Sequence, residues 1–320
     1  MGVAMSNSVA VEVQELTKHT RAVEAPRGTL IIVAWTAMLL ASNLTNICWR
    51  ELAGGEPYWW PWVHAIGLLT LFAVTLVSTT LKSLRRYGLV LLTIFFLGLG
   101  GGWDWGLIPF LRSSLVWTNW ERQMPWALSA IATHLLRLVP ALVILAFSLL
   151  TGLRRSDLFL VRGKIDALVE PSKLLGMKKP EPWTRIGSIF AIVFTVVTFV
   201  FLMFTWKLSS NAFVNALLLI PVALLIATMN AFNEEFTLRA APLSTLLPAI
   251  GKQQALLITT VYFGLGHFYG VPDNVPGVLM SAFLGWFLGK SLLETKGFFW
   301  AWLIHFLPDA FIFTFYAMSA

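Results

Sequence analysis

The hydrophobic positions of this chain gather in runs of about twenty residues, separated by short polar or basic connections. A helix of that length crosses roughly 30 Å of hydrocarbon at about 1.5 Å per residue. Barrel strands would instead alternate with a period of two over about ten residues, and the runs show no such alternation. The pattern therefore predicts an all-α, polytopic transmembrane bundle of about eight or nine helices.

The expected spans cover approximately residues 30–48, 60–81, 88–107, 126–150, 186–206, 212–232, 255–268, 277–293 and 298–317. The longest polar stretch, residues 153–184, contains three prolines and separates four spans from five. We therefore expect four regions: a cytoplasmic tail (1–28), an N-terminal four-helix transmembrane module (29–152), a cytoplasmic basic linker (153–184) and a C-terminal domain (185–320).

Composition agrees with a membrane location. Of the 320 residues, 57% are hydrophobic and only 12% are charged, and the net charge is +7. Lysines and arginines cluster before the first span, after the second and in the linker, which predicts that these segments are cytoplasmic in a multi-pass protein of the plasma membrane. The positive charge thus indicates membrane lipid as a partner and not nucleic acid. The single Cys48 excludes an intrachain disulfide.

Ionisable residues inside spans are costly and mark candidate sites. After the linker they occur in three short elements, and the first reads Asn-Glu-Glu-Phe-Thr-Leu-Arg from Asn233 to Arg239. If the helix continues, Glu235 and Arg239 pair on one face, while Glu234 points about 100° away and stays free for another partner. A juxtamembrane charge cluster that closes a helix is the simpler alternative.

The second and third elements each contain a histidine. Gly264 and Gly266 precede His267 and allow another backbone to approach closely, although a lone membrane histidine more often joins two helices by a hydrogen bond. His305 and Asp309 lie four apart in the last span, so Asp309 can accept a hydrogen bond from one ring nitrogen and orient the imidazole.

Two ionisable residues of the N-terminal module also lie in an apolar run. His134 and Arg137 belong to the fourth expected span, and we expect Arg137 either to extend toward the headgroups or to pair with Asp104.

Together the three elements resemble the CPBP family of intramembrane peptidases, the CAAX protease and bacteriocin-processing family also called Abi. The pattern Glu-Glu-x-x-x-Arg at 234–239, Phe-x-x-x-His at 263–267 and His-x-x-x-Asp at 305–309 matches every defining position in order. Asp309 stands where many members have Asn. The resemblance covers roughly residues 185–318, and the first four spans carry no recognised motif.

The resemblance implies an intramembrane endopeptidase that acts on membrane-associated, in some cases lipidated, peptides or proteins, by CAAX-type or leader processing. It implies that Glu234 activates a water, that His267 and His305 position this water or stabilise the oxyanion, and that Asp309 completes the cluster, supported by Glu235 and Arg239. Glu234, His267 and His305 could also hold zinc, although the H-E-x-x-H spacing of ordinary zinc peptidases is absent. Metallo- and glutamate-type hydrolysis both remain open.

Two other functions fit the same residues. A proton-coupled transporter also places His, Asp and Glu at mid-membrane, and a catalytically silent scaffold or immunity protein would keep the fold. One difficulty for a peptidase is depth: as simple spans, Glu234 falls near one end of its helix and His267 near the far end of the next. Catalysis therefore requires the helix of Glu234 to be displaced or extended, or the segment of His267 to be tilted or incomplete.

Overall fold

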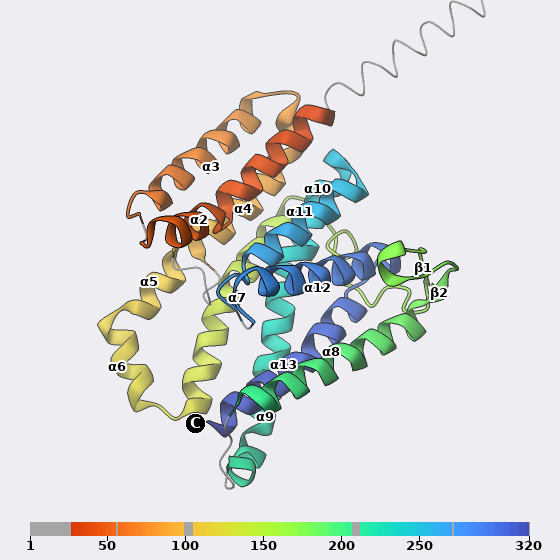
Figure 1. Cartoon of the computed structure of the whole chain (residues 1–320). Coiled ribbons are helices and arrows are strands. Elements are labelled where there is room, and N and C mark those ends of the chain that lie inside the picture. The colour runs from red at the N-terminus through yellow and green to blue at the C-terminus, as the bar shows by residue number, and fades with distance from the viewer. Residues whose placement is uncertain (1–26, 56, 99–104, 207–211, 271, 320) are drawn as a thin grey trace, which may run out of the picture.

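The computed structural model describes residues 27–55, 57–98, 105–206, 212–270 and 272–319, with only the backbone described for 212–216 (Figure 1). The predicted tail, residues 1–28, lies almost entirely outside this range. The described chain is a bundle of helices whose only sheet is a two-stranded antiparallel pair, so the predicted all-α class is confirmed.

The N-terminal part contains the helix Arg27–Ala41 and six labelled α-helices with one 3-10 turn. These are α2 (Leu44–Ala53), α3 (Trp60–Val77), η1 (Leu81–Leu84), α4 (Arg85–Leu97), α5 (Leu107–Ser113), α6 (Leu115–Gln123) and α7 (Trp126–Leu150).

The remaining elements begin in the polar stretch after α7. They are β1 (Leu168–Val169), η2 (Lys173–Leu175), β2 (Glu181–Pro182), α8 (Trp183–Thr205), α9 (Ala212–Glu235), a π-helical turn η3 (Phe236–Ala240), α10 (Ala241–Ile250), α11 (Lys252–Leu265), α12 (Asn274–Thr295) and α13 (Phe299–Met318).

Six helical segments of the described residues are long and apolar enough to cross a membrane, or seven if the bent pair Arg27–Ala41 and Leu44–Ala53 is one span. The expected count of eight or nine was thus approximate. Two expected spans are short helices: α4 ends after 13 residues at Gly98, whose φ is +71°, and α11 has 14 residues. Helix α8 exposes many large apolar side chains along its length, as a lipid-facing helix does.

The helix that carries Glu234 is much longer than predicted. Residues Leu217–Ile250 form one apolar helical segment of 34 residues, in which α9, η3 and α10 follow one another without a break. The prediction that this span ends near Phe232 is therefore wrong, and Glu234 lies at the middle of the segment. The extension is one of the two irregularities that the sequence analysis requires if Glu234 and His267 are to meet.

Helix α9 runs through the middle of the bundle, packed mainly against α13 and α7, while α8 lies against α13 (Figure 1). Ala223, Ala227 and Ala231 repeat every four residues and are fully buried. Small side chains at this spacing form one helical face and let a neighbouring helix approach closely. This packing brings side chains of α7 and α13 next to Glu234.

The polar stretch after α7 is docked onto the loop between α12 and α13. Lys164 N donates to Thr295 O and Phe298 N to Val161 O, both at 2.8 Å. Trp300 Nε1 donates to Ile165 O at 2.8 Å. On the same side, a hydrogen bond from Lys252 Nζ to Glu170, at 2.6 Å, lowers the pKa of that carboxyl. The segment predicted as a linker is thus held in place by the C-terminal part.

Substituting Gly163 tests this docking. Gly163 has φ +72°, and a Cβ there would lie 2.5 Å from Gly297 Cα. The two backbone segments would have to move apart to make room for it. We expect Gly163→Ala to cost about 1–3 kcal/mol more than the matched control Gly176→Ala. Gly176 has a similar φ, +65°, but open space around its Cβ position. Thermal unfolding in detergent measures the difference, and equal melting temperatures for the two variants would contradict the docking.

Candidate functional site

Three carboxylates surround the imidazole of His305, which lies in the middle of α13. Its Nδ1 is 2.5 Å from Glu235 Oε1, and its Nε2 is 3.7 Å from Glu234 Oε2 and 3.6 Å from Asp309 Oδ2. The structure thus brings His305 next to Glu234 and Glu235, which lie 70 or more positions earlier in the sequence. All three carboxylates lie on the two helices, α9 and α13, that pack most closely.

The carboxylate that orients His305 is Glu235. The sequence predicts that Asp309, four residues after His305, orients the imidazole. The distance from Asp309 Oδ2 to His305 Nε2 is 3.6 Å, which is too long for a hydrogen bond. Asp309 Oδ2 instead accepts a hydrogen bond from Asn230 Nδ2 at 2.9 Å. With Nδ1–H donating to Glu235, the ring presents Nε2 to Glu234.

Glu235 also forms the ion pair with Arg239 that the spacing predicts, and both side chains are fully buried. The guanidinium carbon of Arg239 lies 3.6 Å from the centre of the Phe263 ring. Arg239 therefore links the Glu-Glu element to the helix that precedes His267, and Glu235 links it to His305.

Glu234 points away from the pair of Glu235 and Arg239 and meets another partner, Arg137. Its Oε1 is 3.1 Å from Nη2 of Arg137, which lies on α7 and is 97 residues earlier in the chain. The two side chains are only 14% and 16% exposed. Asp104, one of the partners expected for Arg137, lies outside the described residues. The ion pair leaves Oε2 of Glu234 directed toward His305.

His267 follows α11 and approaches the cluster from another side. Its Nδ1 is 2.8 Å from Phe263 O, and its ring centre is 4.4 Å from that of Phe263. The ring is close enough to Glu234 for the two to interact electrostatically. Because Nδ1–H donates to the carbonyl, the neutral ring presents Nε2 as an acceptor.

The sequence analysis did not assign two residues of this cluster, Asn230 and Arg137, to the site. Asn230 lies in an apolar run, four residues before Glu234 and therefore on the same face of the helix. This polar residue at a buried position is the sequence feature that could have indicated its role. Arg137 was noticed, but nothing in the sequence connects it with Glu234.

The donor atoms of the cluster are largely engaged by one another. Glu234 Oε1 pairs with Arg137, Glu235 Oε1 with Arg239 and His305 Nδ1, and Asp309 Oδ2 with Asn230. Among the described residues, no group of three or more His, Cys, Asp or Glu side chains is arranged to hold a metal ion. The three residues named as possible zinc ligands, Glu234, His267 and His305, are thus not grouped as a metal site in this arrangement, although Glu234 Oε2, His267 Nε2 and His305 Nε2 take no part in these hydrogen bonds.

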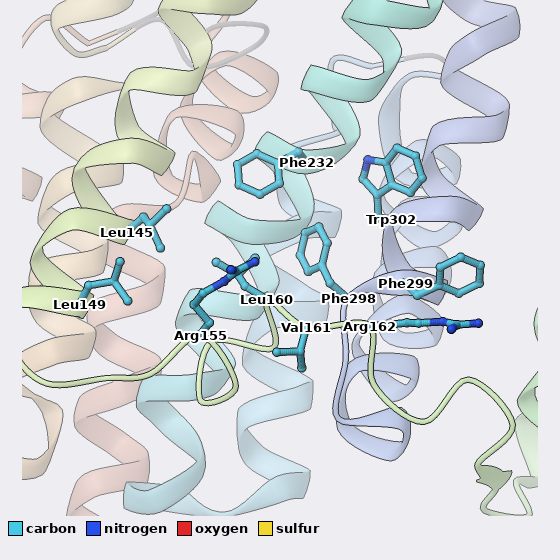
Figure 2. Close-up of a pocket in the computed structure, with 10 residues that line it drawn as sticks. All are labelled: Leu145, Leu149, Arg155, Leu160, Val161, Arg162, Phe232, Phe298, Phe299 and Trp302. Carbon is cyan, nitrogen blue, oxygen red and sulfur yellow. The ribbon is translucent and has the colours of Figure 1, made fainter.

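A cavity of about 530 Å³ lies between α7, α9, α13 and the docked segment (Figure 2). Its walls are apolar side chains of α7, α9, α13 and the docked segment, and two arginines, Arg155 and Arg162, lie among them. Phe232 and Trp302 of this wall precede Glu234 and His305 by two and three residues, within one helical turn. The cavity thus lies about one helical turn from Glu234 and His305 along their helices, and none of the site residues lines it.

Comparison with known proteins agrees with this geometry. Residues 216–311 match the family model of the type II CAAX prenyl endopeptidase, Rce1-like. The chain carries an Rce1-like segment. That segment contains Glu234, His267, His305 and Asp309, and it is consistent with the CPBP resemblance, which is thereby confirmed. No curated protein and no solved structure is significantly similar to the chain.

The Rce1-like segment begins in α9 and ends within α13. Helices α7 and α8 and the docked segment therefore lie outside it. Together with the membrane-spanning helices, the match identifies an integral, multi-pass membrane protein with a protease-type domain.

Proposed function

We propose that this protein is a glutamate-type intramembrane endopeptidase that hydrolyses peptide bonds of membrane-associated substrates. The observation that carries the proposal is the pair Glu234 Oε2 and His305 Nε2, which face each other at 3.7 Å in the middle of the bundle. One water can lie within hydrogen-bond distance, about 2.8 Å, of both atoms at that separation.

The balance of positive and negative charges in the cluster is compatible with hydrolysis by a general base. Glu234, Glu235 and Asp309 carry three negative charges when ionised, and Arg137 and Arg239 carry two positive ones. One additional proton makes the cluster neutral, as a site surrounded by apolar helices requires. We place this proton on His305, whose Nδ1–H donates to Glu235 and whose Nε2–H then points toward the reacting groups.

The reaction then needs only groups of this chain. Glu234 Oε2 takes a proton from the water while the water oxygen attacks the scissile carbonyl carbon. His305 Nε2–H donates to the oxygen on which negative charge develops, and His267 Nε2 accepts from the water and orients it. When the C–N bond breaks, protonated Glu234 passes its proton to the leaving amine. Asp309, held by Asn230, keeps His305 in its protonated form by its charge.

The substrate class that we propose rests on the cavity between α7, α9, α13 and the docked segment. In Figure 2, Arg155 extends between the leucines of α7 and Phe298, while Arg162 extends beside Phe299. An apolar space with cationic side chains fits an amphiphile with a negative end, such as a lipidated or strongly apolar peptide. We propose that such a peptide enters from the face of the docked segment, which the basic residues predict to be cytoplasmic.

Filling the cavity should weaken binding of such substrates. Leu149 lines the cavity, whereas the next residue, Leu150, is 87% exposed and does not. We expect Leu149→Trp to raise KM about tenfold for lipidated peptides with little change in kcat, because the added ring occupies space needed for binding and not for chemistry. Leu150→Trp is the matched control. The same KM in both variants would show that substrates bind elsewhere.

The proposed function is tested with purified protein in proteoliposomes. The substrates are a library of membrane-anchored peptides, some with an S-farnesyl cysteine near the carboxyl end, and mass spectrometry identifies the products. We expect cleavage that survives chelator treatment. Cleavage abolished by the chelator and restored by zinc would replace the glutamate mechanism by a metal-dependent one. No cleavage of any peptide would favour a proton-coupled transporter or a silent scaffold.

A further inference from the structure

The ion pair between Arg137 and Glu234 joins the Rce1-like segment to a helix outside it. Arg137 lies on α7, in the part of the chain that the family model does not match. Its guanidinium contacts the one carboxylate to which the proposed mechanism assigns the proton transfer, at 3.1 Å. Both side chains are largely buried, so water does not compete strongly for this contact.

The geometry divides the two oxygens of Glu234 between two partners. Oε1 faces Arg137 Nη2, and Oε2 faces His305 Nε2. Without a partner for Oε1, the carboxylate could rotate about its last bond and present either oxygen, or turn away from the water. The guanidinium therefore fixes which oxygen acts and in which direction it points.

The position of α7 is itself fixed next to the site. His134, one turn before Arg137, is buried and packs edge-on against Phe313 of α13, with ring centres 4.9 Å apart. Helix α7 also packs along α9. Arg137 is thus held between the two helices that carry Glu234 and His305.

We propose that Arg137 is a positioning residue for peptide hydrolysis: it holds Glu234 Oε1 so that Oε2 faces the water and His305. This inference rests on the proposed function. It means that a residue of the N-terminal helices, outside the Rce1-like segment, takes part in positioning the general base. An Arg suits this role better than a Lys because a planar guanidinium fixes the orientation of a carboxylate better than an ammonium does.

Kinetics of Arg137 variants test this role. We expect Arg137→Gln to lower kcat about 100-fold with KM nearly unchanged, because a misdirected base slows the chemical step and does not affect binding. Arg137→Lys keeps the charge and should recover part of the loss, giving a kcat about tenfold below that of the wild type. The substrate is the library peptide that the wild type cleaves fastest.

Arg185→Gln is the matched control. Arg185 also pairs with a glutamate, Glu181, at 3.0 Å, but on the surface of α8, and its side chain is 65% exposed. We expect its kcat to stay within about twofold of wild type. An unchanged kcat in Arg137→Gln, or equal losses in Arg137→Gln and Arg137→Lys with a raised KM, would overturn the proposal.

A second measurement does not depend on proteolysis. In a double-mutant cycle of thermal unfolding, Arg137→Gln should lower the melting temperature of the wild type but change it little when Glu234→Gln is already present. Additive shifts would show that the two side chains do not interact and would overturn the inference. If the wild type cleaves no peptide, the proposed function fails, and with it the catalytic role, while the cycle still reports whether the contact exists.

Discussion

Glu234→Gln is expected to lower kcat for peptide cleavage by about 10³-fold, the largest effect of any single substitution in this protein. Glutamine has nearly the same shape but cannot accept the proton of the attacking water. Its side chain also lacks the charge that pairs with Arg137 at 3.1 Å. Turnover of the fastest library peptide by the purified variant measures the loss.

The control for this substitution is Glu121→Gln. Glu121 is likewise paired with an arginine, Arg112, at 3.9 Å, but it is 37% exposed and lies on α6, outside the site. Its cleavage rate should equal that of the wild type. If Glu234→Gln keeps more than about a tenth of the wild-type kcat, Glu234 is not the general base, and Asp309 becomes the next carboxylate to consider.

The second large effect concerns stability. Arg239→Met removes the cation from an ion pair in which both side chains are fully buried, and leaves Glu235, within the described part of the chain, with His305 as its one polar partner. Breaking such a pair from one side typically costs about 3–5 kcal/mol, because a buried charge loses its compensation. We expect a large fall in melting temperature, measured by thermal unfolding in detergent.

Two comparisons make this expectation specific. The double variant Glu235→Leu, Arg239→Met removes both charges and should recover part of the lost stability. Arg185→Gln breaks an ion pair with the same four-residue spacing on an exposed surface and should cost less than about 0.5 kcal/mol. A double variant less stable than Arg239→Met would show that the uncompensated charge of Glu235 is not the cause of the lost stability.

Much of the fold was predictable because the membrane restricts the choices. Long apolar runs allow only helices, and the four-residue spacing of Glu235 and Arg239 was enough to predict their ion pair. The end of the helix of Glu234 was misjudged for a physical reason. Asn233, Glu234 and Glu235 look like the polar end of a span, but Glu234 pairs with Arg137 of α7 and Glu235 with Arg239 of the same segment, so the helix continues to Ile250.

The partners within the site were less predictable. Spacing alone favours Asp309 as the partner of His305, yet Glu235 Oε1 lies closer to the ring. Likewise, no local pattern pairs Arg137 with Glu234, since the contact depends on how α7 packs against α9. Sequence periodicity reports which residues share a face of one helix, whereas contacts between helices depend on tertiary packing.

The length of the helical segment that carries Glu234 ties the protein to the thickness of its bilayer. Thirty-four residues extend about 51 Å, well beyond a hydrocarbon core of about 30 Å, so the segment must tilt, or its ends must project into the headgroup regions. Glu234 lies midway along it, and a change of tilt about the centre of the segment moves its ends farther than this carboxylate. Lipids of different chain length would therefore act mainly on the ends of the segment and leave Glu234 aligned with His305 on α13.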